Sequence, residues 1–443
     1  MKRNSKISIL FFSFFIYALA AVGQTPVKLS LTEAQEMAVK QNRLLRISRF
    51  KEQESLDSVK NMRSKYYPNI DAAGLYNYTT NTDVTIPQGI LGSISGFPIP
   101  DQDYKLFEGR HGIVVGGVQV TQPLSQLTKV ATGVKVAETN LSIAKAQTRR
   151  NELKIKQGAE KLYYGILIAK KQREQAMVDL ELYKAQLYDV ESALLAGETD
   201  STRYYGLQAQ ISSGQQKLMQ AGYQIENYTA DLVELTGLPA GTCLELDSVI
   251  RAEPDSTPAA EYQEKAEANN PEIRIAALTR EKAKFGVLAA KKNYIPDLSL
   301  TAGYTYQNVL RLLPDNNYHV GVLMTWKILD WGSRRSLLDQ RRSQENQAEE
   351  LLAHTREQVN NATSKAYRNK LQARQLLDAA GKAVEYRRQE LRFAQNRRAA
   401  GEVLKRDVLT AQSNLAKAET DYFSALLNYR LAGSELQITV GDY

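Results

Sequence analysis

Cysteine, histidine and catalytic motifs are scarce in this chain of 443 residues. Its single cysteine, Cys243, excludes a disulfide framework and a multi-cysteine metal site. The three histidines are scattered, and no histidine motif of a metal site is present. The sequence also lacks a nucleophile elbow and a glycine-rich phosphate loop. We therefore expect no enzyme, no metal and no cofactor.

An excess of charge of one sign is also lacking. The formal net charge is +8, with 57 Lys and Arg against 49 Asp and Glu. Basic pairs such as Arg334-Arg335 and Arg397-Arg398 lie within stretches equally rich in Glu and Gln. This pattern is typical of solvated helix surfaces and argues against a nucleic-acid partner.

The first 23 residues are predicted to be a signal peptide. Lys2, Arg3 and Lys6 precede an apolar run over 7–22 that ends in small residues. Roughly 20 apolar residues are needed to span a bilayer as a helix, so this run favours export with cleavage over a membrane anchor. No cysteine comes directly after the apolar run, so a lipid on the N-terminus of the mature chain is not expected. Beyond it no apolar run is long enough to span, and membrane insertion of the mature chain requires strands closed into a barrel.

Proline is absent from residues 124–238 and 315–443, and both stretches are rich in strong helix formers. Their apolar residues step by four and three, as in a coiled-coil seam. Each stretch is interrupted once, at 196–199 and at 400–403. We expect two helical hairpins, each with one long arm. The arm from Leu127 to Ala196 would be about 105 Å long at 1.5 Å per residue.

The chain repeats itself. Asn42 and Pro68 match Asn270 and Pro296 at a shift of 228, whereas Gly197 and Gly237 match Gly401 and Gly441 at a shift of 204. The change in shift implies an insertion in the first copy, which is predicted to be a long surface loop. The predicted organisation is a first repeat at 24–238, an inter-repeat linker at 239–260 and a second repeat at 261–443.

Alternating apolar and polar residues predict a strand hairpin in each repeat, at about 69–123 and about 297–329. One reading is a soluble sheet with one face against helices. Tyr and Trp at the ends of the apolar face, and a polar face of small side chains, favour membrane-spanning strands instead. The positions then expected to face a pore are Ser299, Thr301, Thr305, Gln307, Thr325 and Lys327. Four strands cannot close, so copies must assemble, giving eight strands from two or twelve from three.

The ordered set of motifs resembles the outer-membrane efflux proteins typified by TolC, over nearly all of the mature chain. The opening Leu31-Thr32-Glu33-Ala34 is similar to the first helix of that family, and Leu436–Gly441 to its end. The strand starts Tyr67-Pro68-Asn69-Ile70 and Ile295-Pro296-Asp297-Leu298 are similar too. Residues 326–332 stand where the family has a strand leading through a glycine-containing turn into a long helix.

The resemblance implies a mainly α fold with a small β part. Three chains would form a twelve-stranded barrel among the lipids of the outer membrane, continued by a coiled-coil periplasmic tunnel of helical hairpins. It implies the exit duct of a tripartite efflux or type I secretion system, passively conducting cargo. The expected partners are a homotrimer, a periplasmic adaptor and an inner-membrane pump driven by protons or ATP. The alternative is a secreted periplasmic helical scaffold or adaptor protein.

Two groups of residues follow as candidate sites. The hairpin tips are expected to dock the adaptor through Gly197, Glu198, Thr199, Gly401, Glu402 and Val403, unless the glycines only shape the turns. The family narrows its periplasmic end with aspartates in an Asp-Val-Leu-Asp pattern, of which Asp407 fits and Thr410 departs. Arg203 is the repeat counterpart of Asp407, and the two are expected to latch neighbouring hairpins, unless both are merely solvated. Cys243 is expected to be a small packed hydrophobe, or else a reactive thiol.

Overall fold

A computed structural model describes residues 27–80, 83–86, 103–107, 112–247, 257–309 and 314–443. The predicted signal peptide, residues 1–23, lies outside them. The chain divides into two compact units. The hairpin unit comprises the described parts of 1–50, 146–274 and 354–443, and the sheet unit those of 51–145 and 275–353. Each unit therefore draws on both repeats.

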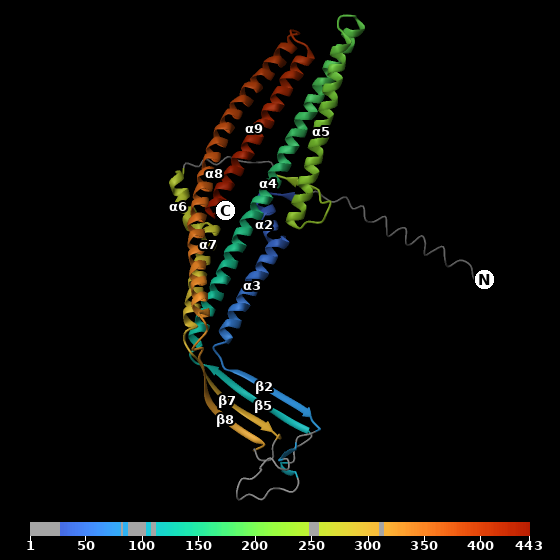
Figure 1. The fold of residues 1–443 in the computed structure, drawn as a ribbon. Coiled ribbons are helices and arrows are strands. Elements are labelled where there is room, and N and C mark those ends of the chain that lie inside the picture. Colours follow the sequence, from blue (N-terminus) through green and yellow to red (C-terminus); the bar gives the residue numbers. More distant parts are fainter. Residues whose placement is uncertain (1–26, 81–82, 87–102, 108–111, 248–256, 310–313) are drawn as a thin grey trace, which may run out of the picture. The chain divides into compact units, whose positions relative to one another are not determined.

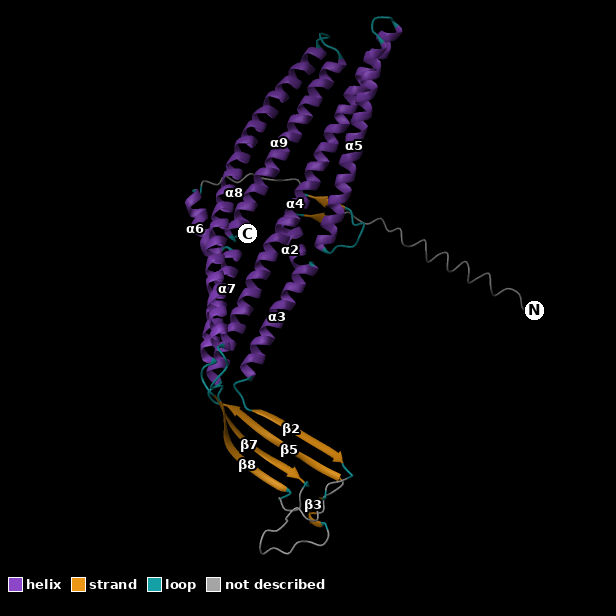
Figure 2. Ribbon diagram, in the orientation of Figure 1, coloured by secondary structure: helices purple, strands orange, loops and turns teal. Residues whose placement is uncertain are grey.

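Two long helical hairpins dominate the structure, as predicted (Figures 1 and 2). One is formed by α4 and α5, the other by α8 and α9. The longest helix, α4, has 69 residues. The helices are α2 (Leu31–Gln41), α3 (Arg43–Ser64), α4 (Leu127–Leu195), α5 (Ser201–Thr236), α6 (Ala259–Asn269), α7 (Pro271–Lys292), α8 (Ser333–Ala399) and α9 (Lys405–Val440). Among the described residues, none of these helices is apolar enough over a sufficient length to cross a membrane.

Helix boundaries repeat at the two shifts found in the sequence. Asn42 and Asn270 precede α3 and α7, and the side chain of each accepts hydrogen bonds from the second and third backbone N–H groups that follow it. Gly237 and Gly441 end α5 and α9 with φ of 71° and 84°. Glycine is favoured here because a left-handed cap strains other residues.

Four antiparallel strands form the main sheet, in the order β2-β5-β7-β8 (Figure 1). They are β2 (Asn69–Tyr78), β5 (Gly112–Pro123), β7 (Asp297–Gln307) and β8 (Asn316–Thr325). The insertion of the first repeat, predicted as a loop, also contains a short antiparallel pair, β3 (Val84–Ile86) and β4 (Tyr104–Phe107). Residues 81–82, 87–102 and 108–111 of that insertion lie outside the described residues.

A second, parallel pair joins β1 (Val27–Leu29) to β6 (Leu244–Leu246) and was not foreseen. It ties the start of the described chain to the inter-repeat segment. The hydroxyl of Tyr163 on α4 lies 3.0 Å from the Leu29 carbonyl oxygen and 2.9 Å from the Asp247 carbonyl oxygen, and its single proton is shared between these two acceptors. Burial raises the pKa of Tyr163 to about 12, so this hydroxyl keeps its proton.

The main core of the hairpin unit surrounds the middle of α4. Ala159, Tyr163 and Ile166 are fully buried there against residues of α2, α5 and α9. A carboxylate, Glu160, is buried beside them and accepts hydrogen bonds from Ser434 Oγ at 2.8 Å and Tyr443 Oη at 2.6 Å. Desolvation raises the pKa of Glu160 despite these bonds and the nearby Arg430. The contacts join the first repeat to the end of the second.

Candidate functional site

The main sheet has one continuous apolar face. Successive side chains of a strand point to opposite faces, and the strand register fixes which residues of neighbouring strands share a face. Most of the apolar side chains on this face are exposed in the single chain. The face comprises Ile70, Ala72, Tyr76, Tyr78, Val114, Val118, Val120, Leu298, Leu300, Ala302, Tyr304, Tyr306, Tyr318, Val320, Val322 and Met324. A surface this large and apolar requires a covering partner.

The opposite face is mostly polar and carries five of the six positions predicted to face a pore. The register places Ser299, Thr301, Thr305, Gln307 and Thr325 together on it. Lys327 is different, because β8 ends at Thr325. The prediction that the strand continues to about residue 329 was wrong. In the first repeat β5 extends to Pro123, which still lies opposite Ser299 of β7, whereas Thr325 of β8 lies opposite Asp297, the first residue of β7.

Two glycines of this polar face allow close strand contact. A Cβ added at Gly117 would collide with the carbonyl oxygen of Tyr304. A Cβ at Gly303 would lie 2.7 Å from His319 Cε1 and 2.9 Å from the Val118 carbonyl oxygen. By contrast, Gly74 has open space around its Cβ position. The sheet interior therefore needs glycine at 117 and 303.

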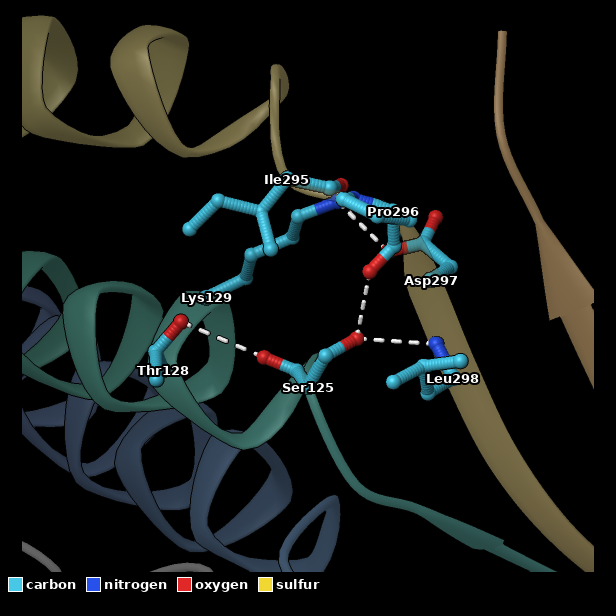
Figure 3. Close-up of polar contacts among 7 residues, drawn as sticks. All are labelled: Ser125, Thr128, Lys129, Ile295, Pro296, Asp297 and Leu298. Atoms are coloured by element: carbon cyan, nitrogen blue, oxygen red, sulfur yellow. Dashed lines mark hydrogen bonds and ion pairs between the residues drawn. The ribbon is translucent and has the colours of Figure 1, made fainter.

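Hydrogen bonds fix the junction between strands and helices (Figure 3). Ser125, just before α4, donates to the Pro296 carbonyl at 2.7 Å and accepts from Leu298 N–H at 2.8 Å. Lys129, in the first turn of α4, forms an ion pair with Asp297 at 2.5 Å. The start of α4 is thus anchored to the start of β7 in the same unit.

The two hairpin tips have the same backbone structure. Gly197 and Gly401 have φ of 73° and 79°. The N–H of Glu198 bonds the Ala193 carbonyl, and that of Glu402 bonds the Arg397 carbonyl, both at 2.9 Å. This pattern is a Schellman cap, so the predicted turn role of the glycines is present at both tips. The Glu402 carboxylate also pairs with Arg397 at 3.1 Å.

The predicted gate residues lie together in the hairpin unit. Arg203, Asp407 and Thr410 line one groove of about 440 Å³. The Asp407 carboxylate accepts a hydrogen bond from Leu404 N–H at 3.0 Å and so caps the start of α9. Thr410 bonds its own helix, at the Arg406 carbonyl. Within the described part of one chain, Arg203 and Asp407 do not form an ion pair with each other. The predicted ion pair between these residues on neighbouring hairpins of a trimer therefore stays a prediction.

Contacts between the two hairpins were missed by the sequence reasoning. Arg406 of α9 lies 3.9 Å from Asp189 of α4. Farther along the same helices, Ser413 Oγ donates to Asp179 Oδ1 at 2.5 Å. No local pattern marks these residues, because the alignment of two helices far apart in sequence decides which side chains meet. These contacts hold the two repeats together close to the groove.

Cys243 lies at another groove, of about 1310 Å³, in the hairpin unit. The side chain is exposed, so the prediction of a packed small hydrophobe was wrong. Within the described residues, no cluster of His, Cys, Asp and Glu is arranged to hold a metal ion.

Comparison with known proteins decides the family. The sequence matches the outer membrane efflux protein family over residues 35–238 and 263–441. The protein belongs to the outer membrane efflux protein family. A comparison with curated proteins gives no significant match. The members of this family are channels. This outer membrane efflux protein is an exit duct that lies in the outer membrane and extends into the periplasm.

Solved structures share the fold of this efflux protein. It is similar to the CmeC outer membrane channel of Campylobacter jejuni, with a TM-score of 0.76 at 14% identity, covering 93% of this chain and 85% of that chain. It is also similar to CusC, with a TM-score of 0.73 at 15% identity and 96% coverage of both chains. The MtrE channel of Neisseria gonorrhoeae gives a TM-score of 0.70 at 17% identity, covering 93% and 88%.

Proposed function

We propose that three copies of this efflux protein join their sheets into a twelve-stranded barrel, with the polar face lining the passage and the apolar face against lipid. The observation that carries the proposal is the sheet itself. It has four strands, one apolar face, and edge strands β2 and β8 that each pair on one side only within the described chain. Unpaired strand edges are not tolerated in a bilayer, so each needs a partner.

Strand direction supports closure by identical copies. All pairs in the sheet are antiparallel, so β2 and β8 run in opposite directions. Edge β8 of one copy can therefore join β2 of the next as another antiparallel pair. Two copies would give about eight strands, whose interior is filled by side chains, whereas three copies leave room for cargo. The passage would be lined by Ser299, Thr301, Thr305, Gln307 and Thr325.

The two hairpin tips are the proposed docking points for a periplasmic adaptor, which would connect the duct to an inner-membrane pump driven by protons or ATP. Their identical caps present Glu198 and Thr199 on one hairpin and Glu402 and Val403 on the other. Six similar tips in a trimer would offer the adaptor repeated sites. The duct would pass cargo without chemistry of its own, in a tripartite efflux or type I secretion system.

The groove lined by Arg203, Asp407 and Thr410 is the proposed periplasmic gate. In a trimer, Arg203 of one hairpin would face Asp407 of a neighbouring one and hold the aperture shut. One carboxylate per chain at this level gives a weaker aspartate ring than two would, which argues against strong cation binding there.

The mass of the detergent-solubilised protein tests the assembly. Three chains per particle, retained with the outer-membrane fraction after washing in high salt, are the expected result. Reconstitution into a planar bilayer should then give conductance steps. A helical monomer that stays in solution without detergent, and washes off membranes in salt, would rule out the barrel. Such a result would favour the alternative function, a secreted periplasmic scaffold.

A further inference from the structure

The gate groove, lined by Arg203, Asp407 and Thr410, is an open space of about 440 Å³ between α4, α5 and α9 in the hairpin unit. Helices α5 and α9 contribute equivalent positions to it at the shift of 204. Arg203 corresponds to Asp407, and Gly206 corresponds to Thr410. A Cβ added at Gly206 would meet no atom within 4 Å. The groove therefore leaves room for a ligand between the two repeats.

The gate groove has more positive than negative charge. Among its described lining residues, Arg203 and Arg406 are the basic ones and Asp407 is the one acid. Asp407 is already engaged, because one carboxylate oxygen accepts the backbone N–H just before α9 at 3.0 Å and the other lies 3.7 Å from Arg406 Nε. The side-chain amides of Gln186 and Gln210 also line the groove. Its electrostatics thus favour an anion over a cation.

Arg203 is the groove residue that lacks a counter-charge. Its backbone N–H bonds the carboxylate of Asp200 at 3.3 Å, but within the described part of the chain its guanidinium forms no ion pair. Arg406, by contrast, lies beside Asp407 and 3.9 Å from Asp189. A guanidinium presents five N–H donors in a planar fork that matches two oxygens of a phosphate or a carboxylate. Arg203 is therefore the group of the groove that is free to bind an anion.

Two more features of the groove suit a ligand with an anionic end and an apolar part. Helices α5 and α9 begin at Ser201 and Lys405, so the positive ends of two helix dipoles lie beside the groove. Val190 and Leu207 line it as well, and both are buried. A ligand whose anionic oxygens contact Arg203 can place an apolar group against these two side chains.

We propose that the gate groove binds a phosphate group carried by cargo from the periplasm, and that this binding opens the gate. In the proposed trimer, Arg203 holds the aperture shut by pairing with Asp407 of a neighbouring hairpin. Phosphate in the groove occupies the same guanidinium and so releases that pair. Opening by phosphate rests on the proposed gate, because only an aperture that is held shut can be released.

A phosphate group competes well with a carboxylate for a guanidinium. A phosphate monoester carries a charge of about −1.5 to −2 at pH 7 and three strong acceptor oxygens, whereas the Asp407 carboxylate carries a single charge. A ligand shifts an equilibrium by its differential affinity for the two states, and Arg203 is available to phosphate only in the released state. Thr410 favours this binding, because a second aspartate at that position, as in the family pattern, would repel phosphate.

Calorimetry on the detergent-solubilised trimer of the full mature chain tests the binding. Inorganic phosphate and phenyl phosphate are titrated at constant ionic strength, with chloride as the reference anion. Both phosphates should bind, and phenyl phosphate should bind several-fold more tightly because its ring covers the apolar lining of the groove. Equal affinities would assign the groove to free phosphate and remove cargo from the proposal. No binding of either phosphate would overturn it.

Two pairs of variants locate the bound phosphate. Arg203→Gln should weaken binding about tenfold or more, whereas Lys184→Gln, which removes an exposed positive charge of α4 outside the groove, should bind like the parent. Gly206→Met fills the groove at unchanged charge and should abolish binding. Gly222→Met, on the same helix and also with open space around its Cβ position, is the control and should bind normally. If Arg203→Gln or Gly206→Met binds as well as its control, phosphate binds elsewhere and the proposal is wrong.

Single-channel conductance separates release by phosphate from the gate itself. Phenyl phosphate on the side of the hairpin tips should raise the conductance of the parent several-fold at constant ionic strength, and should add nothing in Asp407→Arg, whose gate is already open. If Asp407→Arg conducts more than the parent but phenyl phosphate leaves the parent unchanged or blocks it, the gate stands and its release by phosphate is wrong. If neither raises the conductance, the proposed gate fails together with its release.

Discussion

The hydroxyl of Tyr443, the last residue of the chain, donates a hydrogen bond of 2.6 Å to the buried carboxylate of Glu160 in the middle of α4. The same hydroxyl accepts from Gln35 Nε2 at 2.5 Å. A single side chain thus connects the end of the second repeat to two helices of the first. A hydrogen bond to a buried charge contributes more to stability than a neutral one.

Removing that hydroxyl is expected to destabilise the protein. Tyr443→Phe leaves a Glu160 oxygen without its donor and should cost about 1.5–3 kcal/mol, seen as a lower midpoint of thermal unfolding. Tyr188→Phe, on an exposed tyrosine of α4, is the control and should change little. Equal midpoints for both variants would show that the bond contributes nothing measurable.

Glu160 should also make stability depend on pH. Its pKa in the folded protein is raised above the ordinary 4.5, so the folded state binds more protons than the unfolded chain between the two values. The stabilising contribution is therefore complete below the unfolded pKa and is lost as the pH rises through the folded one. Glu160→Gln should remove this fall from the thermal midpoint measured against pH. A profile identical to the parent's would contradict it.

Two glycines of the sheet should differ in tolerance. Gly117→Ala places a methyl group against the Tyr304 carbonyl oxygen and forces β5 and β7 apart, whereas Gly74→Ala meets open space. We expect the first to reduce the yield and heat resistance of the assembled trimer, at a cost of about 1–3 kcal/mol per chain, and the second to be neutral. The ratio of trimer to monomer after graded heating measures the difference, and equal ratios would argue against close packing at 117.

Neighbouring residues of β7 should respond oppositely to arginine. Ala302 lies on the apolar face and Thr301 on the polar face. Ala302→Arg buries a charge in lipid at about 2–4 kcal/mol per chain and should block assembly. Thr301→Arg should assemble normally and shift the conductance toward anions, as measured by reversal potentials in planar bilayers. If Thr301→Arg blocks trimer assembly and Ala302→Arg assembles normally, the polar face of the sheet contacts lipid and the apolar face lines the passage, which contradicts the proposal.

The hairpin tips should be needed for efflux and not for assembly. Glu198→Lys with Glu402→Lys reverses the charge of both tips and is expected to abolish efflux at unchanged trimer yield. Glu191→Lys, on the exposed surface of α4 before the tip, is the control for a charge reversal away from the tips and should retain efflux. Normal efflux with both tips reversed would leave Gly197 and Gly401 only their role in the turns.

The gate is tested by charge exchange. Asp407→Arg should raise single-channel conductance, and adding Arg203→Asp should return it toward the parent. Because Asp407 also caps α9 through Leu404 N–H, Asp407→Asn is the control that keeps a capping side chain without the charge. If the double exchange conducts as much as Asp407→Arg alone, Arg203 and Asp407 do not latch neighbouring hairpins.

The sequence alone determined the long helices, their caps and the four strands of the main sheet. Proline-free stretches, the glycines of the tips and caps, and alternation in the strands are local signals, because each acts through the backbone conformation of nearby residues. The sequence repeat made these local signals more informative. A helix boundary at Asn42 predicts a second one at Asn270, and a helix end at Gly237 predicts a second one at Gly441. The family resemblance, which rests on the order of such motifs, was confirmed by the family match.

The tertiary structure decided what depends on partners distant in sequence. Strand β8 ends at Thr325 because this residue pairs with Asp297, where β7 begins, and β7 has no earlier residue to pair with. The alternation of apolar and polar residues continues past Thr325 but cannot extend the strand. The short strands β1 and β6 pair although they lie far apart in the sequence, and the Tyr163 hydroxyl contacts the carbonyls of Leu29 and Asp247 beside them. Contacts of Glu160 with Tyr443 and of Arg406 with Asp189 depend on how helices far apart in the chain align. The pattern of side chains along a helix or strand encodes which of its faces is buried. Only the packed fold determines which residues on two elements contact each other.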